Sequence, residues 1–243
     1  MNASVLQQTI GNTDAGVAAF CTVAYGSNIS AGSTGLCIVA FNSFLTITSL
    51  IDSNSNNWGS PLQSVTDSTQ HITMALYALP NMVAGALSLT ANINTATQQL
   101  VVWPVEVGGV TTSPVDGFNG ADQVSPGTVA DALSSGNITP LNQPNLLVSF
   151  CADIGPSTTT PSKHAAATLG ISGASWSAHM LGAYISQSQR LTSTNPVAGT
   201  FTATTGTDHF LTMGIILDEI VAQTLPPYAP PTQFFVNEVY LQQ

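Results

Sequence analysis

The segment Asp52–Trp58 is the most motif-like stretch of the chain. Asp52, Asn54 and Asn56 alternate with spacer residues, and this D-x-N-x-N pattern begins like a calcium-binding loop, whose oxygen ligands also alternate. The sixth position holds asparagine where such a loop has glycine, and the twelfth holds glutamine where it has a bidentate glutamate. Asp and Asn also dominate tight turns, because their side chains hydrogen-bond the nearby backbone. We therefore predict a turn, with a metal site at these three residues as the alternative.

Carboxylates and histidines are the other residues that could carry chemistry. A glycosidase needs two carboxyl groups that converge on one bond, and four acids lie near the ends of predicted strands: Glu106, Asp153, Asp218 and Glu219. Twelve acids scattered over one domain will often form such pairs by chance. The four histidines show neither H-x₃-H nor HExxH spacing, so we predict ordinary histidines rather than zinc ligands: His71, His164, His179 and His209.

No nucleophile or phosphate-binding motif accompanies these residues. The sequence contains no G-x-S-x-G elbow, no Walker A motif and no G-x-G-x-x-G. We therefore predict a protein that is not an enzyme and that has no cofactor. A glycoside hydrolase or lyase remains a third hypothesis, carried by the paired carboxylates.

Tryptophans could supply a platform on which sugars stack. Trp103 and Trp176 fall in apolar, strand-like runs and are predicted to be core residues. Trp58 lies in the turn-like segment, and we predict that its ring is exposed and could contact a glycan.

The charge balance excludes several classes of partner. The chain has 243 residues, two Lys+Arg against 12 Asp+Glu, and a formal net charge of −10. Charged residues make up 6%, against about 25% in an average soluble domain. Two cations cannot form the basic face that binds nucleic acid or an anionic membrane. The longest apolar runs are strand-sized rather than the roughly 20 residues of a membrane span, and the N-terminus lacks the features of a Sec signal.

The elements that must position these residues read as strands throughout. Residues 71–79 and 86–93 alternate between apolar and polar side chains, as half-buried strands do. Continuously apolar runs at 35–41, 99–107, 145–153, 176–187 and 209–220 are typical of central strands. Turn-rich segments separate them, and no helical heptad is present. We predict an all-β fold, an antiparallel two-sheet β-sandwich that is jelly-roll-like.

The three cysteines all lie in apolar, strand-like runs: Cys21, Cys37 and Cys151. We predict buried thiols, and a cross-strand disulfide between Cys21 and Cys37 stays open as the alternative.

The two ends differ in character from the middle. We predict an N-terminal arm or edge strand over residues 1–17, the sandwich domain over 18–222, and a proline-rich C-terminal arm over 223–243. Four prolines stiffen this arm as an extended connector. An apolar, strand-like segment follows them, which we predict to dock on a neighbouring subunit through Phe234, Phe235, Val236, Val239 and Tyr240.

Several stretches of the chain are distinctive: TITSLIDSNSNNWG, HITMALYALPNMVAGALSLTANI and QQLVVWPVEVGGVTTSPVDGFNGA, together with Asn145–Val148 and the strand before ILDEI. These stretches resemble a loosely defined family of β-sandwich proteins from bacterial genomes and from tailed phages and prophages. The resemblance spans roughly residues 18–220 and departs at Asn56-Asn57, where the family usually has Gly-Asn. It implies a jelly-roll-like sandwich of the kind found in virion or cell-surface structural proteins, and it transfers no catalytic residue.

The sequence therefore predicts a structural protein on the outer surface of a phage-like particle: a capsid decoration, head fibre or tail component. A carbohydrate-binding module or adhesin is the alternative. The expected partners are copies of the chain, in a homo-oligomer that could be a trimer, and other virion proteins, with a glycan as a further candidate. An acidic protein facing packaged DNA would be repelled, so we expect it on the outside of the virion, after synthesis in the host cytoplasm.

Overall fold

A computed structural model describes residues 2–12, 18–54, 56, 58–97, 100–127, 131–154, 169–171, 177–181, 184–203 and 206–221. Every regular element in this part of the chain is a β-strand, and every pairing between strands is antiparallel. The predicted all-β class is thus confirmed. Among the described residues there is accordingly no apolar helix of membrane-spanning length. The predicted C-terminal arm over residues 223–243, with its apolar residues from Phe234 to Tyr240, lies outside the described residues.

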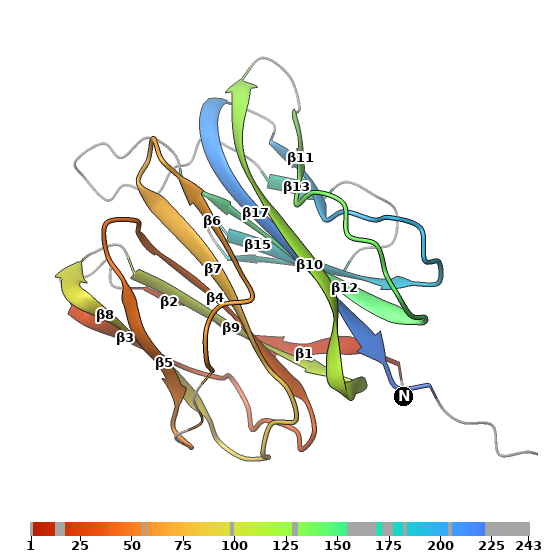
Figure 1. Ribbon diagram of the computed structural model, residues 1–243. Coiled ribbons are helices and arrows are strands. Elements are labelled where there is room, and N and C mark those ends of the chain that lie inside the picture. The colour runs from red at the N-terminus through yellow and green to blue at the C-terminus, as the bar shows by residue number, and fades with distance from the viewer. Residues whose placement is uncertain are drawn as a thin grey trace, which may run out of the picture.

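The first half of the chain forms two sheets (Figure 1). The first central sheet has the order β1–β9–β4–β7–β6, and β2 also pairs with β9. Its strands are β1 (Ser4–Gln8), β2 (Gly11–Asn12), β4 (Thr34–Asn42), β6 (Gln63–Asp67), β7 (Ile72–Leu79) and β9 (Leu100–Gly108). The first outer sheet has the order β3–β8–β5, with β3 (Ala18–Ala24), β8 (Ser88–Thr97) and β5 (Ile47–Asp52).

The second half forms two more sheets. The second central sheet has the order β10–β17–β12–β15–β14. Its strands are β10 (Val110–Gly127), β12 (Asn145–Asp153), β14 (Ser177–Leu181), β15 (Tyr184–Leu191) and β17 (Gly206–Glu219). The second outer sheet has the order β11–β16–β13, with β11 (Asp131–Ser134), β16 (Thr200–Ala203) and β13 (Leu169–Ile171).

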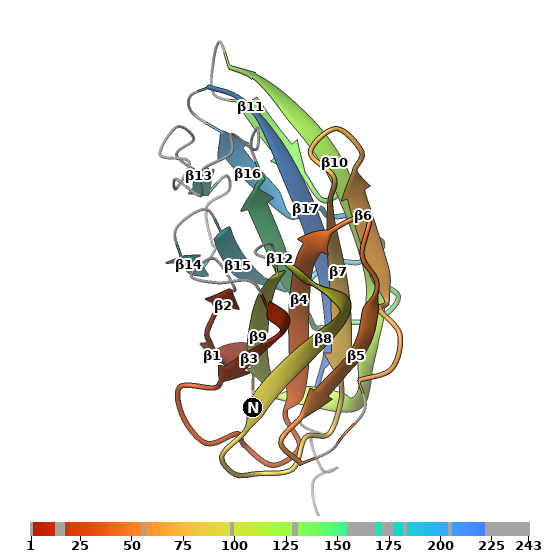
Figure 2. The ribbon, with the colours of Figure 1, turned by 90° about the vertical axis from the view of Figure 1, so that its left-hand side faces the viewer.

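The four sheets are stacked as layers, with the two central sheets face to face (Figures 1 and 2). In β4, Leu36 and Ile38 pack toward the second central sheet, whereas Cys37 and Val39 pack toward the first outer sheet. In β12, Val148 likewise packs between the central sheets. The opposite face of β12 is covered on the side of the second outer sheet. Central strands are buried on both faces, which explains why their sequences are apolar without alternation.

The strand order of the second half repeats that of the first. The short β2 is left out of the count here. The central sheet of each half then has its strands in the order first, last, third, sixth and fifth. The outer sheet of each half has the order second, seventh and fourth. Equivalent strands start about 112 residues apart, as Thr34 and Asn145, Ile72 and Tyr184, or Ser88 and Thr200 do.

The observed layers differ from the single two-sheet sandwich expected from the sequence. There are four sheets because each central sheet is apolar on both faces and so needs a cover on its outer side as well. The division between the halves falls at Gly109, between β9 and β10, inside the range 18–222 that the sequence suggests as one domain. Gly109 has a φ of +74°, which glycine adopts without strain.

Candidate functional site between the central sheets

Asp67 ends β6 and begins the tight turn into β7. Its Oδ1 atom accepts hydrogen bonds from the backbone N–H groups of Thr69 at 2.6 Å and Gln70 at 2.8 Å. This is the local turn chemistry that aspartate favours. The side chain is 1% exposed, so the turn holds a buried carboxylate in a fixed orientation.

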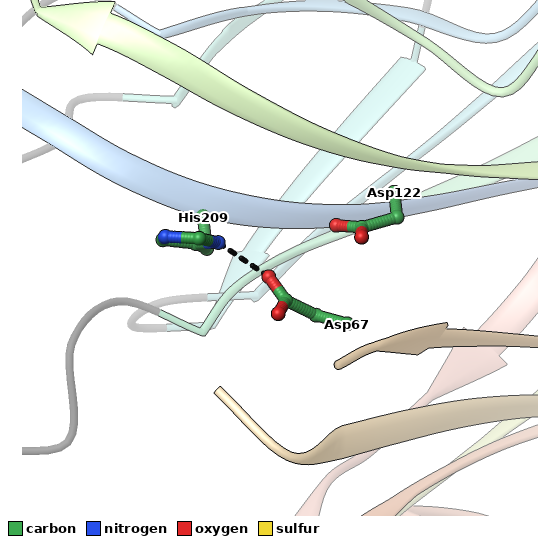
Figure 3. Close-up of side chains that lie close together, drawn as sticks. All are labelled: Asp67, Asp122 and His209. Carbon is green, nitrogen blue, oxygen red and sulfur yellow. Dashed lines mark hydrogen bonds and ion pairs between the residues drawn. The ribbon is translucent and has the colours of Figure 1, made fainter. Parts of the chain in front are cut away.

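The other oxygen of this carboxylate faces the second half of the chain. Asp67 Oδ2 is hydrogen-bonded to Nδ1 of His209 on β17, 142 residues away in sequence (Figure 3). The His209 side chain is 17% exposed. Burial by itself would raise the pKa of Asp67, but the hydrogen bonds from the Gln70 amide, His209 and the Thr69 amide outweigh it, and the pKa is lowered.

Asp122 on β10 completes the cluster, and its carboxylate points toward the other two side chains (Figure 3). One ligand atom from each of Asp67, Asp122 and His209 lies within 4.8 Å of the others. Burial raises the pKa of Asp122, and the negative charge of Asp67 raises it further, while His209 offsets only part of the effect. Two carboxylates therefore share one imidazole at the contact between the halves.

This arrangement can hold a proton or a cation. Carboxylate oxygens and imidazole nitrogen are the donor set of zinc and similar divalent ions. Within the described residues, this is the one group of three or more His, Cys, Asp or Glu side chains close enough to share an ion.

A neutral cluster also joins the two halves. Gln8 on β1 accepts hydrogen bonds through Oε1 from Trp103 Nε1 at 3.2 Å and from Ser186 Oγ at 2.6 Å. β1 and β10 are equivalent first strands of the two halves, and each lies beside the opposite half, β1 against β15 and β10 against β6. The two halves therefore contact each other through a titratable cluster where β10 meets β6 and through an uncharged cluster where β1 meets β15.

Asp52, Asn54 and Asn56 form the turn that the sequence favours. Asp52 Oδ1 accepts the backbone N–H groups of Asn54 and Asn56, both at 3.0 Å, and Oδ2 accepts the side-chain amide of Asn56 at 3.1 Å. The carboxylate is thus occupied by its own loop. The metal alternative gains no support from these contacts.

Trp58 is placed differently from our expectation of an exposed ring. The residue is 4% exposed and packs in the core between the first central and first outer sheets. Its ring lies over Gly35 of β4, where an added Cβ would come within 2.5 Å of Trp58 Cη2. The turn leads the chain back over the sheet, and the missing side chain at Gly35 leaves room for the indole.

The carboxylates considered for a glycosidase are bound by different partners. Glu106 is 1% exposed and accepts Gln7 Nε2 at 2.6 Å and the Ser30 backbone N–H at 2.7 Å. Glu219, which is 4% exposed, forms a two-pronged ion pair with Arg190, at 2.7 and 3.1 Å. Each glutamate lies near the end of its strand, β9 or β17, and anchors neighbouring elements.

Asp218 belongs to a separate polar group at the end of β17. Its Oδ2 accepts Asn142 Nδ2 at 3.1 Å, and nearby Asp116 accepts Asn145 Nδ2 at 2.7 Å. Burial, followed by the charge of Asp116, raises the pKa of Asp218. Asp153 is buried at the end of β12.

The remaining predicted residues have simple surroundings. All three cysteines lie in the described part of the chain; each is buried, and no disulfide joins Cys21 to Cys37. His71 packs against the Phe44 ring with centroids 4.5 Å apart. The side chains of His164, His179 and Trp176 lie outside the described residues.

From the sequence, His209 is predicted only as an ordinary strand histidine, and neither Asp67 nor Asp122 stands out. The three residues are separated by 55 and 87 positions, so no local motif could reveal them. One signal was available: Asp67 is followed by a polar turn that an aspartate typically initiates. No protein-family profile, curated protein or solved structure matches the chain.

Proposed function

We propose that this protein is a non-enzymatic structural component of the outer surface of a phage-like particle, and that each of its halves is a jelly-roll-like unit. The repeated strand order carries this proposal. In a jelly roll the first strand pairs with the last, and the chain winds inward through nested antiparallel pairs, as two Greek keys. Both halves have this nesting.

Doubling of the fold favours assembly. Two halves with the same strand order offer two related surfaces within one molecule. A copy that docks on one half leaves the other half open to a further copy, and such contacts extend into rings or shells. This supports a homo-oligomeric component with copies of itself and other particle proteins as partners.

The buried carboxylates support a structural role. Asp52, Asp67, Glu106 and Glu219 each accept hydrogen bonds that hold a turn, a loop or a strand in place. A net charge of −10 also suits an outward-facing surface, because packaged nucleic acid would repel it.

The C-terminal arm supplies the test of assembly. We expect the full chain to form oligomers in size-exclusion chromatography with light scattering, and a chain lacking residues 225–243 to remain a folded monomer. The arm docks by strand addition in this proposal, where backbone hydrogen bonds give affinity and apolar side chains give specificity. Replacing Phe234, Phe235 and Val236 by serine should therefore abolish assembly, whereas the matched change of Thr232 and Gln233 to serine should leave it intact. Normal assembly of the truncated chain contradicts arm docking.

Glycan binding is a second candidate function. Because Trp58 is buried, the candidate binding surface is the outer face of the first outer sheet. There, Phe20 is 56% exposed, and its register neighbours Asn92 and Ser49 are joined by a 2.9 Å hydrogen bond. An exposed aromatic ring beside amide and hydroxyl groups suits a sugar. Binding on a glycan array that is lost in Phe20→Ala but kept in Phe44→Ala supports it, and binding that survives Phe20→Ala rejects this face.

A further inference from the structure

We propose that Asp67, Asp122 and His209 bind one divalent transition-metal ion, for which Zn²⁺ is the probe, and that this ion links the two halves of the chain. The inference does not depend on the function proposed above. Asp67 comes from the first half, whereas Asp122 and His209 come from the second, so the ion would add a bond across the interface of the central sheets.

The donor atoms fit the ion in type and lie close enough together to be drawn around it. Zinc takes carboxylate oxygen and imidazole nitrogen at about 2.0–2.2 Å in a tetrahedral arrangement. The three donor atoms lie within 4.8 Å of one another. Asp67 and His209 now contact each other directly and must separate slightly to admit the ion. Asp122 is exposed and His209 half-buried, and a water can occupy the fourth position.

Asp67 is oriented in advance by its own turn. Its Oδ1 is held by two backbone N–H groups, of Thr69 and Gln70, which directs Oδ2 toward the second half. Outer hydrogen bonds of this kind fix metal-binding carboxylates and raise their affinity. A buried carboxylate held in this way loses little conformational entropy on binding.

The charges also favour a cation. The cluster places two carboxylates beside one imidazole, in a chain with only two Lys+Arg. One of these cations, Arg190, is already paired with Glu219. Burial and then the negative charge of Asp67 raise the pKa of Asp122, and a divalent ion would neutralise that charge.

The test uses the untagged full-length protein, stripped with EDTA and dialysed. We expect isothermal titration with ZnCl₂ to give one site per chain, and the midpoint of thermal unfolding to rise with the logarithm of the zinc concentration, because the ion binds only the folded state. Asp122→Asn should abolish both effects. It should also raise the unfolding midpoint of the metal-free protein, because it removes a repelled carboxylate while leaving the Asp67–His209 pair.

Two controls separate this site from other binding. The double change of His164→Gln and His179→Gln should leave zinc binding unchanged. Ser186→Ala, in the neutral cluster around Gln8, should leave it unchanged too. Saturable zinc binding that persists in Asp122→Asn, or the absence of one-to-one binding in the wild type, overturns the proposal. In the latter case the cluster holds only a proton.

Discussion

At the scale of single residues, Asp67 connects a local turn to a distant strand. One of its oxygens binds the turn that follows β6, and the other binds His209 of the second half. The same carboxylate therefore orders its own hairpin and holds the two central sheets together. Because the group is buried, its hydrogen bonds are not weakened by exchange with water, as those of a surface pair are.

The lowered pKa of Asp67 predicts acid sensitivity. The folded chain holds the ionised form more tightly than the unfolded chain, whose aspartates titrate at about 3.9. The resulting stabilisation is complete above that pH and is lost as the pH falls through the lower, folded value. Asp67→Asn should reduce the free energy of unfolding at pH 7 by about 2 kcal/mol. It should also flatten the loss of stability between neutral and acid pH, as measured by urea unfolding at a series of pH values. An unchanged pH dependence in the variant would assign the acid sensitivity to other groups.

Arg190 and Glu219 give a second prediction at this scale. Glu219 is buried, whereas the Arg190 side chain is 43% exposed. Removing the arginine leaves a buried carboxylate without its partner, and this costs more than removing both. We therefore expect Arg190→Leu to be destabilising, and Arg190→Leu with Glu219→Gln to be less so, in denaturant unfolding. If the double variant is the less stable one, then Glu219 stabilises the fold through contacts other than the ion pair.

At the scale of elements, the strand β4 illustrates how one sequence run serves two cores. Alternate side chains enter the core between the central sheets and the core beneath the first outer sheet. Gly35 interrupts this series, and the Trp58 ring fills the space above it. The indole thereby fixes the connection between β5 and β6 on the surface of β4.

This packing predicts that Gly35→Ala is destabilising by about 1–3 kcal/mol, the usual cost of overpacking a core. The added Cβ would lie within 2.5 Å of Trp58 Cη2 and 2.6 Å of Met82 Sδ. Phe lacks the far ring of the indole, so Gly35→Ala combined with Trp58→Phe should cost less than the two changes added together. Thermal and denaturant unfolding of the four proteins measures the coupling. Simple additivity would mean that the ring moves away at no cost.

At the scale of the whole molecule, the two halves share one apolar interface. Trp103 of the first half meets Phe150 of the second edge-on, with ring centroids 5.3 Å apart. Leu36 from the first half and Ile215 from the second lie in the same core. Each half also has a separate core under its own outer sheet. Burial of the shared face is the main favourable contribution to the association of the halves, because it removes apolar surface from water.

We predict that residues 1–109 and 110–243 fold together but not apart. Each fragment alone exposes the apolar face of a central sheet and should aggregate. Produced together, they should co-purify as a one-to-one complex with the β-rich circular dichroism of the intact chain. The intact chain should unfold in a single transition. A fragment that is monomeric and unfolds cooperatively by itself would show that the halves are independent domains.

The sequence by itself determined the all-β class, the central strands and the turn at Asp52, because these depend on periodicity and on local backbone chemistry. The repeat of about 112 residues between equivalent strands is visible only in the strand order of the structure, because the equivalent strands have different side chains. Only the tertiary structure decided the stacking of four sheets, the burial of Trp58 and the meeting of Asp67, Asp122 and His209. These depend on which surfaces cover one another, and residues far apart in the chain carry no local pattern that records their contact.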